Sequence, residues 1–338
     1  MPPTRMTAAA NMGALACIAV ALAAAACAGP QQPHLFRYAN AQPAQHPRSI
    51  SMAYFEEILE DRTGGRIEVD NHFGGSLGTE RELMDMVALN VLQGTRGGLF
   101  FDVSPKYFVF LLPFLLEDWD QALRLVSSDF AASINLEGRR HGYHVPACGI
   151  SQGFRAHTNS VRPIREPEDF KGLKLRVPPH EPNVILTDIL GANPQEIPFT
   201  EVYQAARTGV IDGQDNALSN IWDTRVHEVQ KYLSISNYMA GPDPFIVNLE
   251  WYEALSPELR TILDAAARDA ISYSDRMNRD SEEAYLNKLS EVLETNWIEG
   301  DALERFREAA TPVYDILVSK GYFTWDDIQA ARRAAEGE

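Results

Sequence analysis

The residues with the most familiar catalytic spacing are Gly74-Gly75-Ser76-Leu77-Gly78, which match the G-x-S-x-G pattern of a serine hydrolase nucleophile elbow. In that motif, a sharp turn between a strand and a helix presents the serine hydroxyl to a general base. Here the preceding segment 66–70 alternates apolar and polar residues, whereas the strand before a hydrolase elbow is normally buried on both faces. No HGGG-type oxyanion loop lies upstream. A glycine-rich turn is the favoured interpretation, and a hydrolase using Ser76 is kept as the alternative.

A second pattern with possible chemistry is the histidine pair His141 and His144, whose spacing would suit two metal ligands on one helical face. Gly142 and Pro146 argue against a helix there, and no nearby carboxylate completes a ligand set. We therefore expect histidines at the surface or at a strand end, and no metal. The sequence contains neither G-x-x-x-x-G-K-[ST] nor G-x-G-x-x-G, so no nucleotide cofactor is expected.

Two arginines on extended segments suggest anion binding. Arg155 lies within the segment 153–159, and Arg176 ends a strand-like segment directly before Pro178. In an open α/β sheet, the carboxyl end of a strand faces a crevice. A guanidinium there can hold a carboxylate through two parallel hydrogen bonds. The alternative is that both arginines pair with acidic side chains at the surface.

The elements that must position these residues alternate between strands and helices. Thr79 and Glu82 form a capping box that predicts a helix start, and Thr200 is expected to cap the helix ending at Gly209. Hydrophobic periodicity predicts strands at 35–38, 66–70, 149–159, 173–177, 195–197, 229–238 and 245–250, and helices at 52–59, 79–89, 119–127, 183–190, 200–209 and most of the chain after 256. This alternation predicts an α/β fold, with Gly153 and Gly241-Pro242 as candidate crossover points between two lobes.

Composition limits the possible partners. The 338 residues are 45% apolar and 23% charged, as in a soluble globular protein. The 30 Lys and Arg against 47 Asp and Glu give a formal net charge of −17. Such a surface repels phosphate backbones, which argues against nucleic acid as a partner. An anionic ligand would need a pocket that is locally basic.

The N-terminus has the features of an export signal. Residues 12–28 are uncharged and rich in alanine, but they are fewer than the ~20 apolar residues of a spanning helix. We assign 1–30 to a signal peptide and expect the mature protein to be exported. The segment 24–27 resembles a lipoprotein box, in which Cys27 would carry lipid, but it also suits ordinary cleavage. Cys148 is the one cysteine outside this region, so no internal disulfide is expected.

A series of short motifs runs from Gly65 to about Tyr314. They are, in order, LG-x-E-R-E, LPF, G-x-R, RPI-x-x-P-E-D-x-KG-L-K-x-R-V-P, GANP, PF-x-E-V-Y-x-A, TG-x-x-DGQ-x-N and V-x-KY. This series resembles the DctP-type solute-binding proteins of TRAP (tripartite ATP-independent periplasmic) transporters, most specifically over 164–216. The resemblance implies two α/β lobes around a hinged cleft, a long helix that braces both, and no catalysis. It further implies a receptor that closes on an organic acid and delivers it to a small DctQ-type and a large DctM-type membrane subunit.

The resemblance also implies roles for individual residues. Arg176 matches the arginine that clamps the ligand carboxylate, Arg155 a second cleft arginine, and Asn216 the asparagine of a DGQENP segment. Here that segment reads DGQDNA, with Asp215 for Glu and Ala217 for Pro.

The loop 90–101 departs from the family pattern, which leaves the acid open among dicarboxylates, sugar acids and keto acids. Phe100, Phe101 and Phe199 are expected to form an apolar wall, and Arg96 to add a cation. We expect one lobe at 31–152 plus about 242–281, and the other at 153–241 plus about 282–338. An exported serine hydrolase and a periplasmic structural protein are the other classes considered.

Overall fold

The computed structural model describes residues 32–338, so the predicted signal peptide and Cys27 lie outside the described residues. The strands in this part of the chain are β1 His34–Ala39, β2 Ile67–His72, β3 Gly94–Arg96, β4 Tyr143–His144, β5 Cys148–Asn159, β6 Lys174–Val177, β7 Asn193–Glu196, β8 Gly213–Ala217, β9 Tyr232–Ile235, β10 Ala240–Asn248 and β11 Glu294–Trp297. The α-helices are α2 Pro47–Thr63, α3 Glu80–Ala88, α4 Trp119–Val126, α5 Asp129–Glu137, α6 Glu181–Ile189, α7 Val202–Arg207, α8 Leu218–Asp223, α9 Leu249–Ala254, α10 Pro257–Val292, α11 Gly300–Ala310, α12 Pro312–Ser319 and α13 Trp325–Glu336. Among the shorter 3₁₀ turns, η1 Phe100–Asp102, η2 Pro105–Leu111 and η5 Phe199–Glu201 lie near the site described below.

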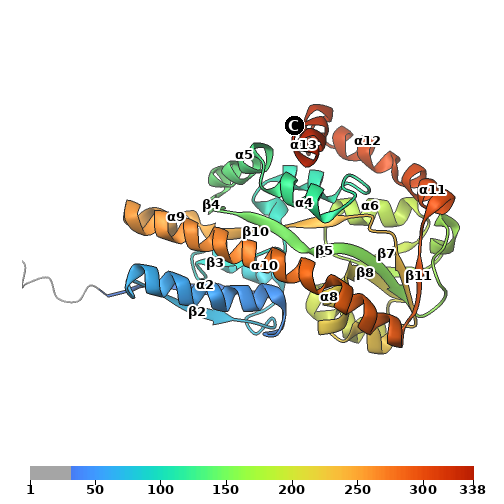
Figure 1. Ribbon diagram of the computed structural model, residues 1–338, viewed down its shortest axis with the longest axis horizontal. Coiled ribbons are helices and arrows are strands. Elements are labelled where there is room, and N and C mark those ends of the chain that lie inside the picture. The colour runs from blue at the N-terminus through green and yellow to red at the C-terminus, as the bar shows by residue number, and fades with distance from the viewer. Residues whose placement is uncertain (1–31) are drawn as a thin grey trace, which may run out of the picture.

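The strands form two sheet regions that share their central members. The order is β2-β1-β3-β10-β5-β8-β6-β7, with β4 beside β10, β9 beside β5, and β11 beside β9. The pairs β1–β2, β1–β3, β6–β7 and β6–β8 are parallel. Strand β10 runs antiparallel to both β3 and β5, and β5 runs antiparallel to β8. The fold is therefore α/β and two-lobed, as predicted, with β5 and β10 passing from one lobe to the other (Figure 1).

The backbone is irregular where these two strands cross between the lobes. Gln152 and Gly153 in β5 have positive φ angles of 65° and 103°. Opposite them, the register of β10 shifts between Ala240 and Pro242. A shift of this kind bends a strand and increases its local twist. The crossover points expected at Gly153 and Gly241-Pro242 lie at this bend.

The long helix α10 ties the two lobes together. Ser256 caps it, Pro257 occupies its first turn, and it runs for 36 residues. Its buried apolar positions in the first half recur at helical spacing and pack on α2. Near its other end, Leu289 belongs to a separate core with β9 and α8. Figure 1 shows this helix lying across both lobes, so the predicted bracing helix is confirmed.

Two local predictions about helix starts have different outcomes. The Thr79–Glu82 capping box is present, and α3 begins directly after it. The prediction that Thr200 caps a helix is wrong, because Thr200 lies inside η5 and α7 begins at Val202 after Glu201. Tyr203, three residues after Thr200, has no carboxylate or amide to complete a capping box.

The C-terminal segment packs on both halves of the molecule. Helix α13 lies against α4 and α5, and Arg124 Nε donates a hydrogen bond to the Ala335 carbonyl at 2.6 Å. Helices α11 and α12 pack on α6.

The lobe boundaries expected from the sequence stay a prediction. Across residues 32–338, none of the helices combines the length and the apolar character that crossing a membrane requires.

His157 is a buried histidine within β5 that affects stability. Its ring stacks on Tyr238, with ring centroids 4.8 Å apart, and meets Phe170 edge-on. Burial lowers the pKa of His157 from 6.5 to about 4, although Asp215 opposes this shift. Because the folded-state pKa is the lower one, the unfolded chain binds the extra proton between these values. The stabilisation is complete above pH 6.5 and is lost as the pH falls toward 4.

Replacing His157 with Phe should therefore make the protein less sensitive to acid. The ring contacts are kept but the titrating group is removed, so the loss of unfolding free energy between about pH 7.5 and about pH 5 should shrink by about 2 kcal/mol relative to wild type. Urea titrations at both pH values measure this difference. His141→Gln, which changes an exposed imidazole, is the control and should leave the wild-type loss intact. An equal loss in His157→Phe and wild type would contradict the assignment.

Candidate functional site

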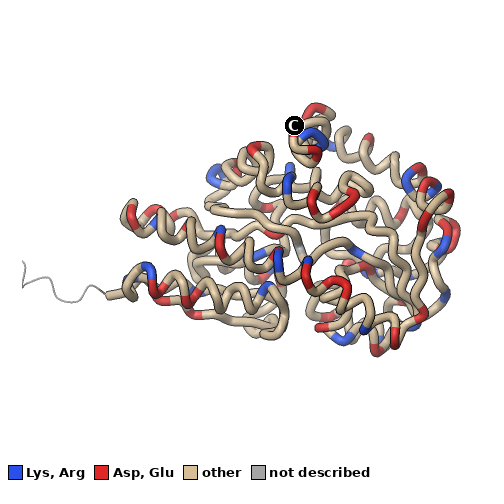
Figure 2. Tube along the Cα trace, viewed as in Figure 1, with Lys and Arg blue, Asp and Glu red and all other residues tan. Residues whose placement is uncertain are grey.

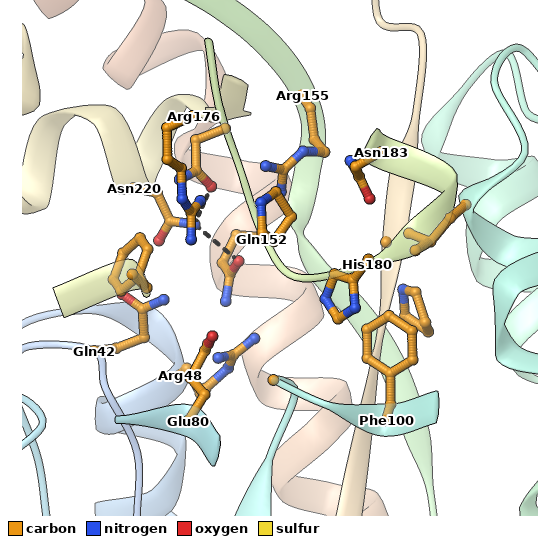
Figure 3. A pocket seen from close by; sticks show the side chains of 17 residues that line it. Gln42, Arg48, Glu80, Phe100, Gln152, Arg155, Arg176, His180, Asn183 and Asn220 are labelled. Atoms are coloured by element: carbon orange, nitrogen blue, oxygen red, sulfur yellow. Dashed lines mark hydrogen bonds between the residues drawn. The ribbon is translucent and has the colours of Figure 1, made fainter. Parts of the chain in front are cut away.

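A polar cavity lies between the two lobes. Its apolar wall includes Phe100, Leu111 and Phe199, and its polar lining is Gln42, Arg48, Glu80, Gln152, Arg155, Arg176, His180, Asn183, Asn216 and Asn220. Figure 3 shows these side chains converging from several elements, with Glu80 and Arg48 on the wall opposite Arg176 and Asn220. Along the chain, charged residues of both signs are interspersed rather than gathered in one basic stripe (Figure 2). Three guanidinium groups, on Arg48, Arg155 and Arg176, line the cavity itself.

Arg176 is the cavity cation without a carboxylate partner. It lies at the end of β6, is 2% exposed, and its Nε donates a hydrogen bond to the Ile197 carbonyl at 2.8 Å. Within residues 32–338, no acidic side chain forms a salt bridge with its guanidinium. Burial lowers the pKa of Arg176 to about 10, although Glu80 nearby opposes this. A buried charge of this kind is costly unless an anion compensates it, so the arrangement is suited to binding a carboxylate.

Arg155 lines the same cavity but already has a partner. Its Nε and Nη2 donate to the side chain and to the carbonyl of Asp215, the second at 2.6 Å. The hydroxyl of Tyr238 donates to the same carboxylate. Burial would raise the pKa of Asp215, but Arg155 outweighs it and lowers that pKa to about 2. Pairing with an acidic residue, the alternative considered for both arginines, is thus correct for Arg155, although the pair lines the cavity and its side chains are only 13% and 5% exposed.

The sequence predicts that Arg96 adds a cation to the cavity, but Arg96 does not reach the cavity lining. Its side chain is fully buried, with Nη2 at 2.6 Å from Asp243 Oδ2 and Nη1 donating to Ser51 Oγ at 2.6 Å. Arg48 shares that carboxylate, with Nη2 at 3.3 Å from Oδ1, and lines the cavity in its place. The reason is geometric, since the Arg96 side chain is turned toward the start of α2. Arg96, at the end of β3, therefore supports the cavity wall and is not part of its lining.

Hydrogen-bonded amides fix the side of the cavity formed by β8 and α8. Asn220 Nδ2 donates to Gln152 Oε1 at 3.1 Å and to Asn216 Oδ1 at 2.6 Å. Asn216 Nδ2 in turn donates to Gln214 Oε1 at 3.2 Å. The structure thus brings the predicted residue Asn216 to the cavity, where its side chain is bonded to the amides of Gln214 and Asn220.

The opposite end of the cavity is aromatic. His180 stacks on Phe100 with ring centroids 4.7 Å apart. Burial, reinforced by Arg155 and Arg176, lowers the pKa of His180 to about 3, so the ring is neutral. Phe199 also lines the cavity, as expected, whereas Phe101 lies behind His180, which it meets edge-on, and is not part of the lining. The expected apolar wall is therefore formed by two of its three phenylalanines.

Some cavity residues were missed by the sequence analysis although signals for them existed. Glu80 belongs to the LG-x-E-R-E motif and begins a capped helix. Gln152 precedes the crossover glycine, His180 follows Pro178-Pro179, and Asn220 lies four positions after Asn216. Gln42, Arg48 and Asn183 carry no such signal, because only the fold brings these residues to the cavity.

The G-x-S-x-G segment has a different role from the one its pattern suggests. Ser76 is exposed on a turn and does not line the cavity. Gly74 and Gly75 have φ angles of 71° and 66°. A Cβ on Gly75 would lie 2.8 Å from Cγ2 of Thr200, which is on the other side of the cleft. The turn is therefore a point of close contact between the lobes.

The histidine pair also lacks the geometry of a metal site. His144 Nε2 lies 2.8 Å from Asp264 Oδ1, and its ring stacks on Tyr252. In the part of the chain that the structure describes, no group of three His, Cys, Asp or Glu side chains is placed to hold a metal ion. His144 sits on strand β4, in line with the strand-end placement expected for this pair.

Two lobes joined by crossing strands, with a polar cavity between them, define the class of two-lobed periplasmic binding proteins. Residues 38–320 match the model of the bacterial extracellular solute-binding proteins, family 7 (DctP). The chain belongs to this family, and it is a solute receptor of the TRAP transporter type.

Individual relatives agree with this assignment. The chain is 29% identical over 300 residues to the C4-dicarboxylate-binding periplasmic protein DctP of Rhodobacter capsulatus, covering 86% of this chain and 88% of that one. It is 30% identical over 264 residues to the 2,3-diketo-L-gulonate-binding periplasmic protein YiaO of Escherichia coli, covering 76% and 78%. The crystal structure of the sugar acid binding protein of Advenella mimigardefordensis with galactonate superposes with a TM-score of 0.86 at 26% identity, covering 90% and 99%. These relatives are receptors and not enzymes, and the hydrolase alternative is not supported.

The contact between the turn and Thr200 predicts an effect on ligand binding. Gly75→Ala should weaken binding of any organic acid that stabilises the wild type, by about tenfold, because the added methyl group holds the lobes apart. Gly74→Ala is the matched control, since it has a similar positive φ but no atom within 4 Å of its Cβ. Isothermal titration calorimetry measures both.

The double variant Gly75→Ala/Thr200→Ser removes the methyl group that the new Cβ meets. Affinity should return to the level of Gly74→Ala if the contact causes the loss. An equal loss in Gly74→Ala and Gly75→Ala would show that backbone strain alone is responsible.

Proposed function

We propose that this protein is exported to the periplasm, where Arg176 clamps the carboxylate of a small organic acid for delivery to DctQ-type and DctM-type membrane subunits. The observation that carries the proposal is the buried Arg176 guanidinium, which faces an inter-lobe cavity and forms no salt bridge within residues 32–338. With Nε held by a backbone carbonyl, the Nη atoms are the donors that face a ligand.

The energy of such a clamp is sufficient for a useful affinity. Hydrogen bonds between charged groups contribute about 1.5–3 kcal/mol each, and more when water is excluded. Two of them with flanking contacts approach the ~8 kcal/mol of a micromolar complex. Burial of Arg176 favours this pairing, because the ligand carboxylate replaces the water that the guanidinium has lost.

The other predicted residues would act around this clamp. Arg155, fixed by Asp215, supplies a positioned guanidinium beside Arg176, and both line the cavity. Asn216 offers an amide to the ligand, and Phe199 closes one side. The relatives support an acidic ligand, because their names record a C4-dicarboxylate, 2,3-diketo-L-gulonate and galactonate.

The export step and the membrane partners rest on the family and on residues 1–30. In this proposal, closure of the lobes on the acid creates the shape that the membrane subunits recognise. Cys27 is then either lipidated or removed with the signal peptide. Mass spectrometry of the mature N-terminus, isolated from cells that export the full chain, distinguishes these two forms.

Arg176→Lys should abolish most of the affinity although it keeps the charge. An ammonium group cannot form two parallel hydrogen bonds with one carboxylate, so we expect a loss of about 100-fold. A thermal-shift screen of organic acids first identifies a stabilising ligand, and calorimetry then compares the variant with wild type.

Arg225→Lys is the matched control because its guanidinium is exposed and pairs with Glu228 away from the cavity. It should bind as wild type does. Wild-type affinity in Arg176→Lys would reject the clamp.

A further inference from the structure

We propose that the ligand is a polyhydroxylated monocarboxylate, a sugar acid of the aldonate or uronate type, and that Glu80 selects against a second carboxylate. This inference rests on the proposed function, because it assumes that Arg176 holds the first carboxylate. It goes further by assigning the rest of the cavity to hydroxyl groups and by naming a specificity-determining residue.

The first argument is the charge in and directly behind the cavity wall. Two of the guanidinium groups in the lining already have a partner, because Arg48 pairs with Asp243 and Arg155 with Asp215. Arg176 has no salt bridge within residues 32–338, so the lining offers one position for a ligand carboxylate. A dianion would leave an uncompensated negative charge in a site with little water, where electrostatic repulsion is strong.

The second argument is the position of Glu80. It is the first residue of α3, held there by the Thr79–Glu82 capping box, and it lines the cavity from the lobe opposite Arg176. Its charge opposes the lowering of the Arg176 pKa by burial, in line with its position across the cavity from that guanidinium. A ligand reaching across from Arg176 meets this carboxylate, which repels a second carboxylate but accepts a hydrogen bond from a hydroxyl group.

The third argument is a set of buried acceptors without partners. Gln42 Oε1, Asn183 Oδ1 and His180 Nδ1 have no hydrogen-bond partner in residues 32–338, and all three side chains line the cavity. Each is more than nine-tenths buried. Buried polar atoms of this kind need a partner. Hydroxyl groups can donate to the oxygens of Gln42 and Asn183, and can either donate to His180 Nδ1 or accept from it, whereas a carboxylate at neutral pH only accepts.

The strongest counter-argument is Arg48, a second cation in the lining. Its guanidinium pairs with Asp243, which also holds Arg96. A dicarboxylate bridging Arg176 and Arg48 would use that cation but would leave the acceptors of Gln42, Asn183 and His180 without donors. The polyhydroxylated monocarboxylate satisfies both the charge and the acceptors, so the observations favour it.

Matched ligands test the proposal directly on the full mature protein. Galactonate and galactarate differ only in one terminal group, a hydroxymethyl in the first and a carboxylate in the second, as do gluconate and glucarate. Hexanoate lacks the hydroxyl groups. Calorimetry, with galacturonate, glucuronate and succinate added to the panel, should find a monocarboxylate sugar acid that binds at least about tenfold more tightly than its aldarate counterpart, than succinate and than hexanoate.

The Glu80→Gln variant tests the residue assignment. It keeps the shape but removes the charge, so the preference for the monocarboxylate over its aldarate should fall by about tenfold. Asp85→Asn, which removes an exposed charge from the same helix outside the cavity, is the control and should keep the wild-type preference.

The outcomes separate this inference from the proposed function. Tighter binding of succinate or an aldarate than of every monocarboxylate, or equal binding of hexanoate, overturns the inference while the receptor function stands. An unchanged preference in Glu80→Gln overturns the role of Glu80. If no acid in a broad screen binds, or if Arg176→Lys binds as wild type does, the proposed clamp fails and this inference fails with it.

Discussion

The organising constraint of this molecule is a guanidinium that is buried without a counter-charge. Arg176 is 2% exposed and its Nε bonds to a backbone carbonyl, and within residues 32–338 no side-chain carboxylate pairs with it. Such a group destabilises the protein by itself, because its hydration is lost and a single backbone hydrogen bond compensates only part of that loss. The same lack of a counter-charge makes the site selective, since only an anion that fits the cavity can neutralise the Arg176 guanidinium.

The other arginines in and behind the cavity wall differ from Arg176 because each of them has a carboxylate partner. Arg155 has Asp215, and Arg48 and Arg96 share Asp243. These pairs hold their guanidinium groups in fixed positions and cancel most of their charge. They therefore shape the cavity wall, while the net attraction for an anion is concentrated at one point. For this reason, the charge that remains after pairing is a better guide to the ligand than the number of cations in the cavity.

The fold serves this site by letting two lobes share one cavity. Strands β5 and β10 bend where they cross, at Gly153 and between Ala240 and Pro242. Helix α10 contributes to the cores on both sides, and Gly75 and Thr200 are one place where the lobes approach each other closely away from the crossing. A structure that is braced along one side and in close contact at the other is suited to opening and closing around a hinge.

The sequence by itself determined the α/β class, the long helix, the capped start of α3 and the family, because these depend on local periodicity, capping chemistry and ordered motifs. It also identified Arg176, Arg155, Asn216 and Phe199, all of which line the cavity. Only the tertiary structure decided that Arg96 pairs with Asp243 and that Arg48, Gln42 and Asn183 reach the cavity. Local sequence cannot carry that information, because the partners are brought together by the chain's path in space: Asp243 and Arg96 lie 147 positions apart and meet only once β10 pairs with β3.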